Sequence, residues 1–247
     1  MMKRFFVIAL FVLGLGQLYA QPVRDTAWTK AGYFGLKLTQ VSLSSWSAGG
    51  ESALAFDSQI TYSADFKRDR QLWQNRLELG YGLTKNDGKS ARKTNDKIYF
   101  ASTYGYQIYK TLYWSALLNF NTQFAKGYDY NIEDSDFISK FMAPGYLMIG
   151  TGVTWSPNKI FTATFTPASW RGTIVADSRL SDEGAFGVDK GKHLLSEFGA
   201  NLKAEVNYEF LPNMKVYSRL ELYSNYLKDP QNIDIRWEVQ LNMAINK

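Results

Sequence analysis

Few residues of this chain are suited to acid–base or nucleophilic chemistry. The sequence contains one histidine, His193, and no cysteine. A hydrolase of the serine type needs a histidine that a polar partner orients and that lies beside the serine nucleophile. Ser196 follows His193 closely in sequence, but this spacing alone indicates no such pair. We therefore expect His193 to be a solvated loop residue, and we expect no catalytic residues and no enzyme; a surface hydrolase is the least favoured alternative.

A cluster of acidic residues offers a second kind of chemistry. It consists of Asp129, Glu133, Asp134 and Asp136. Carboxylate oxygens bind calcium, but the spacing of these four residues matches no calcium-loop pattern. The sequence therefore predicts a solvated acidic loop, with no metal ion and no cofactor.

Charged residues of both signs recur at alternate positions in several segments. Side chains two positions apart on a β-strand point to the same side, so each set shares one face of its strand. We call the following nine residues the charge network: Arg76, Glu78, Lys203, Glu205, Arg219, Glu221, Asp234, Arg236 and Glu238. Charges that leave water must pair or stay hydrated. The network predicts either ion pairs that fill the interior of a slim barrel or the lining of a selective pore.

The elements that carry these charges are predicted to be strands. In the segment 233–245, apolar residues occupy the odd positions and polar or small residues the even ones, a period of two that is typical of a strand. The same pattern predicts ten strands at about 32–44, 52–67, 71–85, 97–109, 112–126, 145–156, 160–175, 196–210, 214–227 and 233–246. The phase of the first strand slips between Leu38 and Val41, and the seventh contains Pro167, so we expect a bulge in each.

The connections between these strands alternate in length. Tight turns at 69–70, 110–111, 157–159 and 211–213 alternate with longer polar loops at 45–51, 86–96, 127–143, 176–192 and 228–232. Short turns on one rim and long loops on the other are typical of outer-membrane barrels. We therefore predict an all-β fold, an antiparallel up-and-down transmembrane β-barrel whose apolar face meets outer-membrane lipid. An exported soluble barrel or sandwich would alternate in the same way, with its apolar face in a core.

The first twenty residues predict export. Lys3 and Arg4 precede an apolar run from Phe5 to Leu15, which is typical of a signal peptide, with cleavage expected before Gln21. Residues 21–247 are then expected to form a single barrel domain in the outer membrane of a Gram-negative bacterium. A formal net charge of +5 is too small to indicate nucleic-acid binding.

Several motifs resemble those of a known family. They are 42–51 (SLSSWSAGGE), 92–98 (RKTNDKI), 116–130, 184–188 (GAFGV) and 223–234. Together they resemble a Bacteroidota domain-of-unknown-function family of outer-membrane proteins. The resemblance implies a location but no activity, ligand or protein partner. Members of the family usually continue past the position of Lys247 with a further hairpin, which implies about twelve strands, of which ten are present here.

The sequence therefore supports two main hypotheses for function. The first is a narrow outer-membrane barrel with a structural, adhesive or accessory role and a charge-paired lumen. The second is a small substrate-selective channel, with the same charges lining a hydrated path.

Overall fold

The computed structural model describes residues 27–43, 50–132, 136–158 and 160–243. The predicted signal peptide and its cleavage point lie outside these residues. Among the described residues, no helix is both long and apolar enough to span a membrane.

One large antiparallel sheet contains most of the described chain. It follows the chain order, so each strand pairs with its neighbours in sequence. Its ten strands are β1 (Trp28–Val41), β2 (Ala53–Arg68), β3 (Gln71–Asn86), β4 (Arg92–Tyr109), β5 (Leu112–Thr122), β8 (Gly145–Trp155), β9 (Phe161–Ile174), β10 (Leu194–Leu211), β11 (Met214–Asn225) and β12 (Ile233–Met243). Each corresponds to a predicted strand, so the all-β antiparallel prediction is confirmed.

The two predicted bulges have different outcomes. Thr151 of β8 pairs with Ala168 and Val153 with Phe165, so β9 carries an extra residue around Pro167. The pairing of β9 with β10 shifts at the same place, which confirms the bulge there. The prediction for the first strand was wrong, because β1 pairs with β2 without a register shift from Trp28 to Val41. The backbone pairing there stays regular although the alternation of apolar residues slips between Leu38 and Val41.

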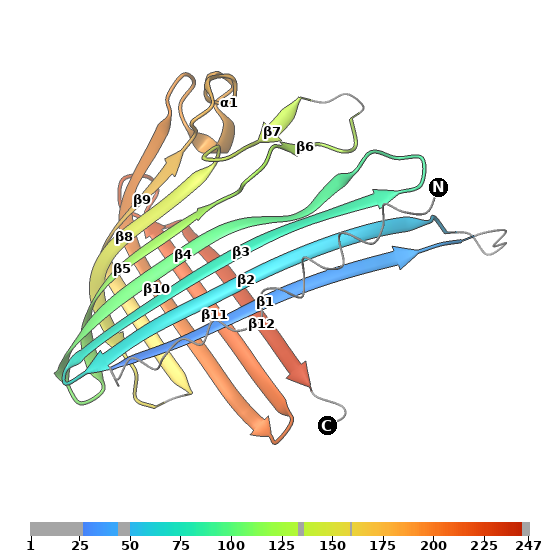
Figure 1. Ribbon diagram of the computed structural model, residues 1–247. Coiled ribbons are helices and arrows are strands. Elements are labelled where there is room, and N and C mark those ends of the chain that lie inside the picture. The colour runs from blue at the N-terminus through green and yellow to red at the C-terminus, as the bar shows by residue number, and fades with distance from the viewer. Residues whose placement is uncertain (1–26, 44–49, 133–135, 159, 244–247) are drawn as a thin grey trace.

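The sheet coils strongly but does not close. In Figure 1, β10, β11 and β12 cross behind the long strands β1 to β5. β1 and β12 are the two edges of the sheet, and they are not paired with each other. The predicted barrel closure is therefore not observed, because neither edge has a partner strand within the described residues.

The two faces of the coiled sheet differ in polarity. The polar side chains line a hollow of about 1600 Å³, to which strands from β2 to β12 contribute. On the opposite face, large apolar side chains remain exposed, from Phe34 and Leu38 on β1 to Ile235 and Trp237 on β12. Trp237 is 71% exposed. The apolar face is therefore not covered by any described part of the chain.

Two of the long loops fold into a cap at one end of the sheet. The first contains β6 (Gly127–Tyr128) and β7 (Phe137–Ser139), and the second contains α1 (Ser178–Asp182) and the 3-10 helix η1 (Ala185–Gly187). A small core of Ala143, Val175, Leu180 and Val188 joins them. We refer to these two loops as the cap.

Candidate functional site

All nine residues of the charge network line the large hollow. They come from β3, β10, β11 and β12. Alternation along each strand places them on the same face, so the coil of the sheet gathers them around one space.

Six of these residues form a checkerboard of opposite charges on β10, β11 and β12. Lys203 lies opposite Glu221, which lies opposite Arg236 on the next strand. Glu205 lies opposite Arg219, which lies opposite Glu238. Opposite charges at facing positions stabilise a strand pair, whereas like charges there destabilise it. The checkerboard therefore favours this register over slipped alternatives.

Ion pairs connect most of the network directly. Arg219 donates to Glu238 at 2.6 Å, Lys203 to Glu205 at 2.9 Å, and Arg236 lies 3.7 Å from Glu221. On β3, Arg76 donates to Glu78 at 2.5 Å. Glu78 also pairs with Lys97 of β4, which was absent from the predicted network. Within the described residues, each of these carboxylates therefore pairs with at least one lysine or arginine side chain.

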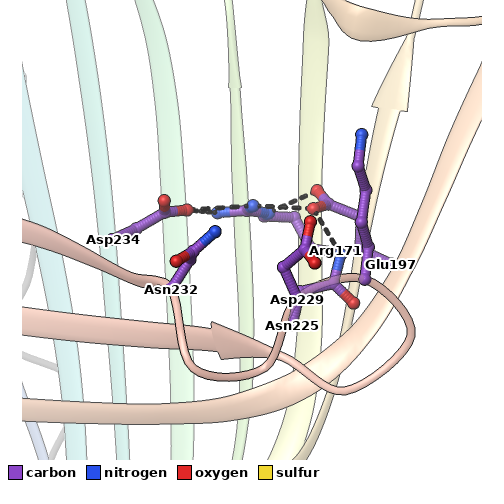
Figure 2. A pocket seen from close by; sticks show the side chains of 7 residues that line it. Arg171, Glu197, Asn225, Asp229, Asn232 and Asp234 are labelled. Atoms are coloured by element: carbon purple, nitrogen blue, oxygen red, sulfur yellow. Dashed lines mark hydrogen bonds and ion pairs between the residues drawn. The ribbon is translucent and has the colours of Figure 1, made fainter.

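Arg171 on β9 is a second residue absent from the prediction, and it forms the most connected cluster. Its Nε and Nη2 atoms donate to the two oxygens of Glu197 at 2.7 and 2.9 Å. Its Nη2 atom also donates to Asp234 at 3.2 Å. Figure 2 shows the guanidinium between these two carboxylates, at the wall of a smaller pocket of about 230 Å³. Arg171 therefore connects three strands, β9, β10 and β12.

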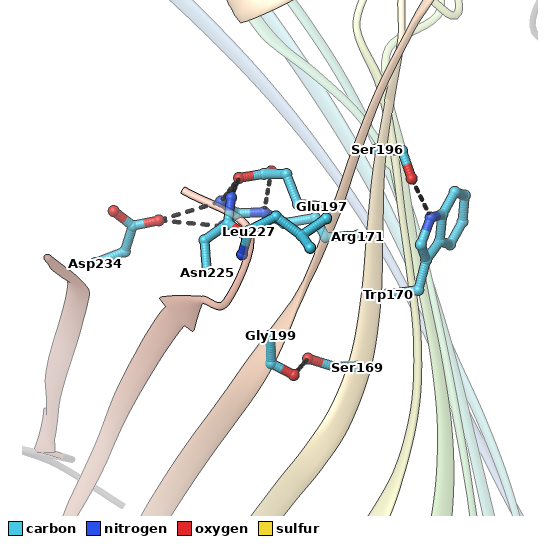
Figure 3. A network of polar contacts seen from close by, with 9 residues as sticks. All are labelled: Ser169, Trp170, Arg171, Ser196, Glu197, Gly199, Asn225, Leu227 and Asp234. Carbon is cyan, nitrogen blue, oxygen red and sulfur yellow. Dashed lines mark hydrogen bonds and ion pairs between the residues drawn. The ribbon is translucent and has the colours of Figure 1, made fainter. Parts of the chain in front are cut away.

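β11 completes the Arg171 cluster. The guanidinium stacks over the ring of Tyr223, 4.0 Å from its centroid, and Asn225 donates to Glu197 at 3.0 Å. Figure 3 shows Asn225 close to Glu197 and Arg171, and Asp234 reaching the same guanidinium. The glycine at 199 makes room for Tyr223, because a Cβ there would lie 3.0 Å from the tyrosine hydroxyl and 2.0 Å from the carbonyl of Ser224. The four strands β9 to β12 are thus fastened together at the long-loop rim.

His193 has a structural role in the fold. Its Nδ1 atom donates to the carbonyl of Val175 at 2.7 Å. The hydroxyl of Ser196 instead accepts a hydrogen bond from the indole of Trp170 at 2.6 Å (Figure 3). The geometry therefore gives neither residue the hydrogen bond that a nucleophile–base pair needs.

The predicted acidic loop is described only in part. Glu133 and Asp134 lie outside the described residues, and the Asp129 carboxylate accepts from the backbone of Asn131 at 3.0 Å. No group of three or more histidine, cysteine, aspartate or glutamate residues in the described part of the chain is arranged to hold a metal ion.

Two carboxylates outside the strands have shifted pKa values. A hydrogen bond from Lys140 lowers the pKa of Asp177, and the backbone N–H of Leu180, which Asp177 caps at the start of α1, lowers it further. The Nζ atom of Lys140 lies 2.5 Å from the Oδ2 atom of Asp177. In the loop before β2, a hydrogen bond from Lys89 lowers the pKa of Glu51. Both carboxylates hold long loops together at the same rim.

Residues 38–128 match a family model. The family is described as Protein of unknown function (DUF3078). The match confirms the resemblance to a family of unknown function that the motifs predicted. It covers the end of β1, all of β2 to β5 and β6, and so includes Arg76 and Glu78 but not the checkerboard. No curated protein and no solved structure matches the chain significantly.

Proposed function

We propose that this chain is an outer-membrane β-barrel protein with a structural or accessory role, whose interior is lined by paired charges. One observation carries the proposal: the coiled sheet has its polar, charged face inside and its apolar face outside and uncovered. Lipid stabilises such an outer face, whereas water does not.

A soluble sandwich would bury the apolar face against another layer. Among the described residues, only seven hydrophobic side chains are buried, and four of them form the core of the cap. Such a core is too small to stabilise a sheet of ten strands in water. The apolar alternation therefore favours a lipid environment over a soluble fold.

The strand lengths fit the same proposal. The ten strands are 11–18 residues long, and a tilted transmembrane strand needs about 9–11 residues. Lipid cannot hydrogen-bond an open sheet edge, so the barrel requires the outer edges of β1 and β12 to find partners in the membrane. In the proposed barrel these edges pair with each other or with partner strands in the membrane.

Membrane fractionation and heat-modifiability on gels test this proposal. The expected result is a protein in the outer-membrane fraction that migrates faster before boiling than after it. A protein that stays in the periplasmic fraction and shows no heat shift would contradict the proposal.

A selective channel is the second candidate, and the size of the hollow favours it. Seven lysine or arginine residues and six aspartate or glutamate residues line the hollow, so its charge is nearly balanced. This balance gives no preference for anions or cations, and the ion pairs occupy much of the polar face. A channel predicts solute uptake by proteoliposomes that changes when Arg219 and Arg236 are neutralised. Uptake equal to that of empty liposomes would contradict the channel and leave the structural role as the remaining candidate.

A further inference from the structure

One residue that lines the large hollow comes from outside the ten-stranded sheet. Among the described residues around the hollow, all others belong to strands, whereas Phe186 belongs to η1 in the cap. Leu195, near the start of β10, lines the same end of the hollow. The cap therefore contributes an aromatic residue to the lining of a space that is otherwise bounded by the sheet.

The backbone of Phe186 adopts a conformation that is rare for a large residue. Its φ of 58° and ψ of 21° are left-handed, and the flanking Gly184 and Gly187 have φ values of 72° and 84°. A non-glycine residue keeps such a conformation only when the surrounding structure enforces it, and such residues cluster at functional sites. The two glycines allow the sharp path of the backbone on either side of Phe186.

Contacts on both sides of η1 hold this loop in place. Phe186 packs against the core of the cap. The hydroxyl of Ser181 donates to the carbonyl of Lys192 at 2.8 Å, and the backbone N–H of Gly191 donates to the carbonyl of Ser181 at 2.9 Å. The ion pair of Lys140 with Asp177 fastens α1 to the other loop of the cap. The ring is thus carried by a folded segment with many partners.

We propose that Phe186 is the constriction of the hollow at its long-loop rim, and that it restricts the passage of hydrated ions and polar solutes from that side. An apolar ring in a polar path offers no hydrogen bonds to a hydrated solute, and hydrophobic constrictions limit permeation in this way. This inference rests on the proposed function, because a constriction requires the sheet to enclose a lumen in the membrane. It also explains how a wide charged hollow belongs to a barrel with a structural role.

A single introduced cysteine tests the constriction, because the chain has no cysteine of its own. Asn119→Cys places a thiol on β5 within the hollow. Its reaction with a membrane-impermeant maleimide is measured on intact cells, with and without Phe186→Asn. Asparagine tolerates left-handed backbone but removes the ring. Phe186→Gly is made alongside, because glycine adopts this backbone without strain.

The matched control is Phe141→Asn, which removes a ring from the same cap. Phe141 is 54% exposed and does not line the hollow. We expect severalfold faster labelling and a higher planar-bilayer conductance for both Phe186 variants, and rates like those of the parent for Phe141→Asn. Heat-modifiability identifies the folded fraction of each variant, and labelling is compared on that fraction.

Two different results would overturn the inference, and they can be distinguished. Equal labelling of the parent and the folded Phe186 variants in the outer membrane would remove the constriction but leave the proposed function. Absence of the parent protein from the outer membrane would remove both.

Discussion

Arg171 and Asp234 form an ion pair although two strands lie between them. Arg171 belongs to β9 and Asp234 to β12, and the closest atoms are 3.2 Å apart. In a flat sheet, three strand spacings of about 4.8 Å would separate their backbones by about 14 Å. The coil of β9 to β12 shortens this distance across the polar face. The two side chains cover the rest of the distance, and the ion pair stabilises the curvature.

We predict that Arg171→Leu destabilises the protein by about 2 kcal/mol. The substitution removes the two hydrogen bonds to Glu197 and leaves that carboxylate, whose side chain is only 13% exposed, without its cation. The partial exposure of Arg171 itself, 30%, keeps the expected cost below that of a fully buried pair. Urea unfolding of the protein in phospholipid vesicles measures the change.

The control for this prediction is the exposed pair of Lys89 with Glu51. Both side chains are about half exposed, at 48% and 49%. Surface pairs contribute little, so Lys89→Ala should change the free energy of unfolding far less than Arg171→Leu does. Equal effects of the two substitutions would show that the Arg171 cluster is no more than a surface contact.

The bulge in β9 explains why the sequence did not indicate Arg171. Before the bulge, Thr162 lines the hollow from an even position, and after it Arg171 and Thr173 do so from odd positions. The extra residue around Pro167 inverts the alternation, so a constant period of two places Arg171 with the apolar face. The proline indicated a bulge. Which residues face the hollow after the bulge depends on which residue remains unpaired, and this depends on the pairing with the neighbouring strands.

The checkerboard predicts a specific result for charge reversal. Arg219→Glu places three carboxylates side by side, because position 219 lies between Glu205 and Glu238. We expect a cost of about 2–3 kcal/mol. Adding Glu238→Arg should recover only part of this cost, since Glu205 still faces a carboxylate. Urea unfolding of both variants and of Glu238→Arg alone completes the cycle.

An exposed pair at the end of the same strands is the comparison. Lys215 and Glu209 lie 3.1 Å apart with side chains 59% and 47% exposed. Lys215→Glu should cost less than about 1 kcal/mol. If Arg219→Glu costs no more than Lys215→Glu, the checkerboard does not set the register.

Strands and loops differ in how far the sequence predicts them. Alternation over many residues identified all ten strands, because a period of two is local and strong. The positions of Glu205, Arg219 and Glu238 on one face followed from the same period, whereas their facing order depends on register. The contribution of Phe186 to the hollow could not be predicted, because it depends on contacts of the cap with residues distant in sequence. Closure of the sheet likewise depends on whether β1 pairs with β12. The residue pattern of neither strand predicts this pairing.

The ion pair of Asp177 predicts a pH dependence for the cap. Lys140 and the N–H of Leu180 lower the pKa of Asp177 below its ordinary value of 3.8 in the folded protein. A lowered pKa means that the stabilisation is fully present above the unfolded value and is lost as the pH falls through the folded value. Protection of the Leu180 amide against hydrogen exchange should therefore decrease below a pH of about 4.

Asp177→Asn tests the cause of this dependence. Asparagine still caps α1 but cannot pair with Lys140. Its protection at neutral pH should be lower than that of the parent and should change less on acidification, after correction for intrinsic exchange. Asp189→Asn, at an exposed position of the same loop, should behave like the parent. A parent whose protection is constant from pH 7 to below its lowered pKa would contradict the prediction.

Adjacent positions on β2 distinguish a lipid-facing sheet from a soluble one. Ile60 is 40% exposed on the apolar face, and its neighbour Gln59 lines the hollow. Both lie near the middle of β2, Ala53–Arg68, where a transmembrane strand crosses the centre of the bilayer. A lysine that faces lipid at this depth costs about 2–4 kcal/mol, whereas a lysine in a polar lumen stays hydrated. Ile60→Lys should therefore reduce the heat-shifted, membrane-inserted fraction strongly, and Gln59→Lys should leave it close to that of the parent. In a protein that folds in water, a partly exposed isoleucine on an uncovered face tolerates lysine, so equal behaviour of the two variants would contradict the outer-membrane proposal.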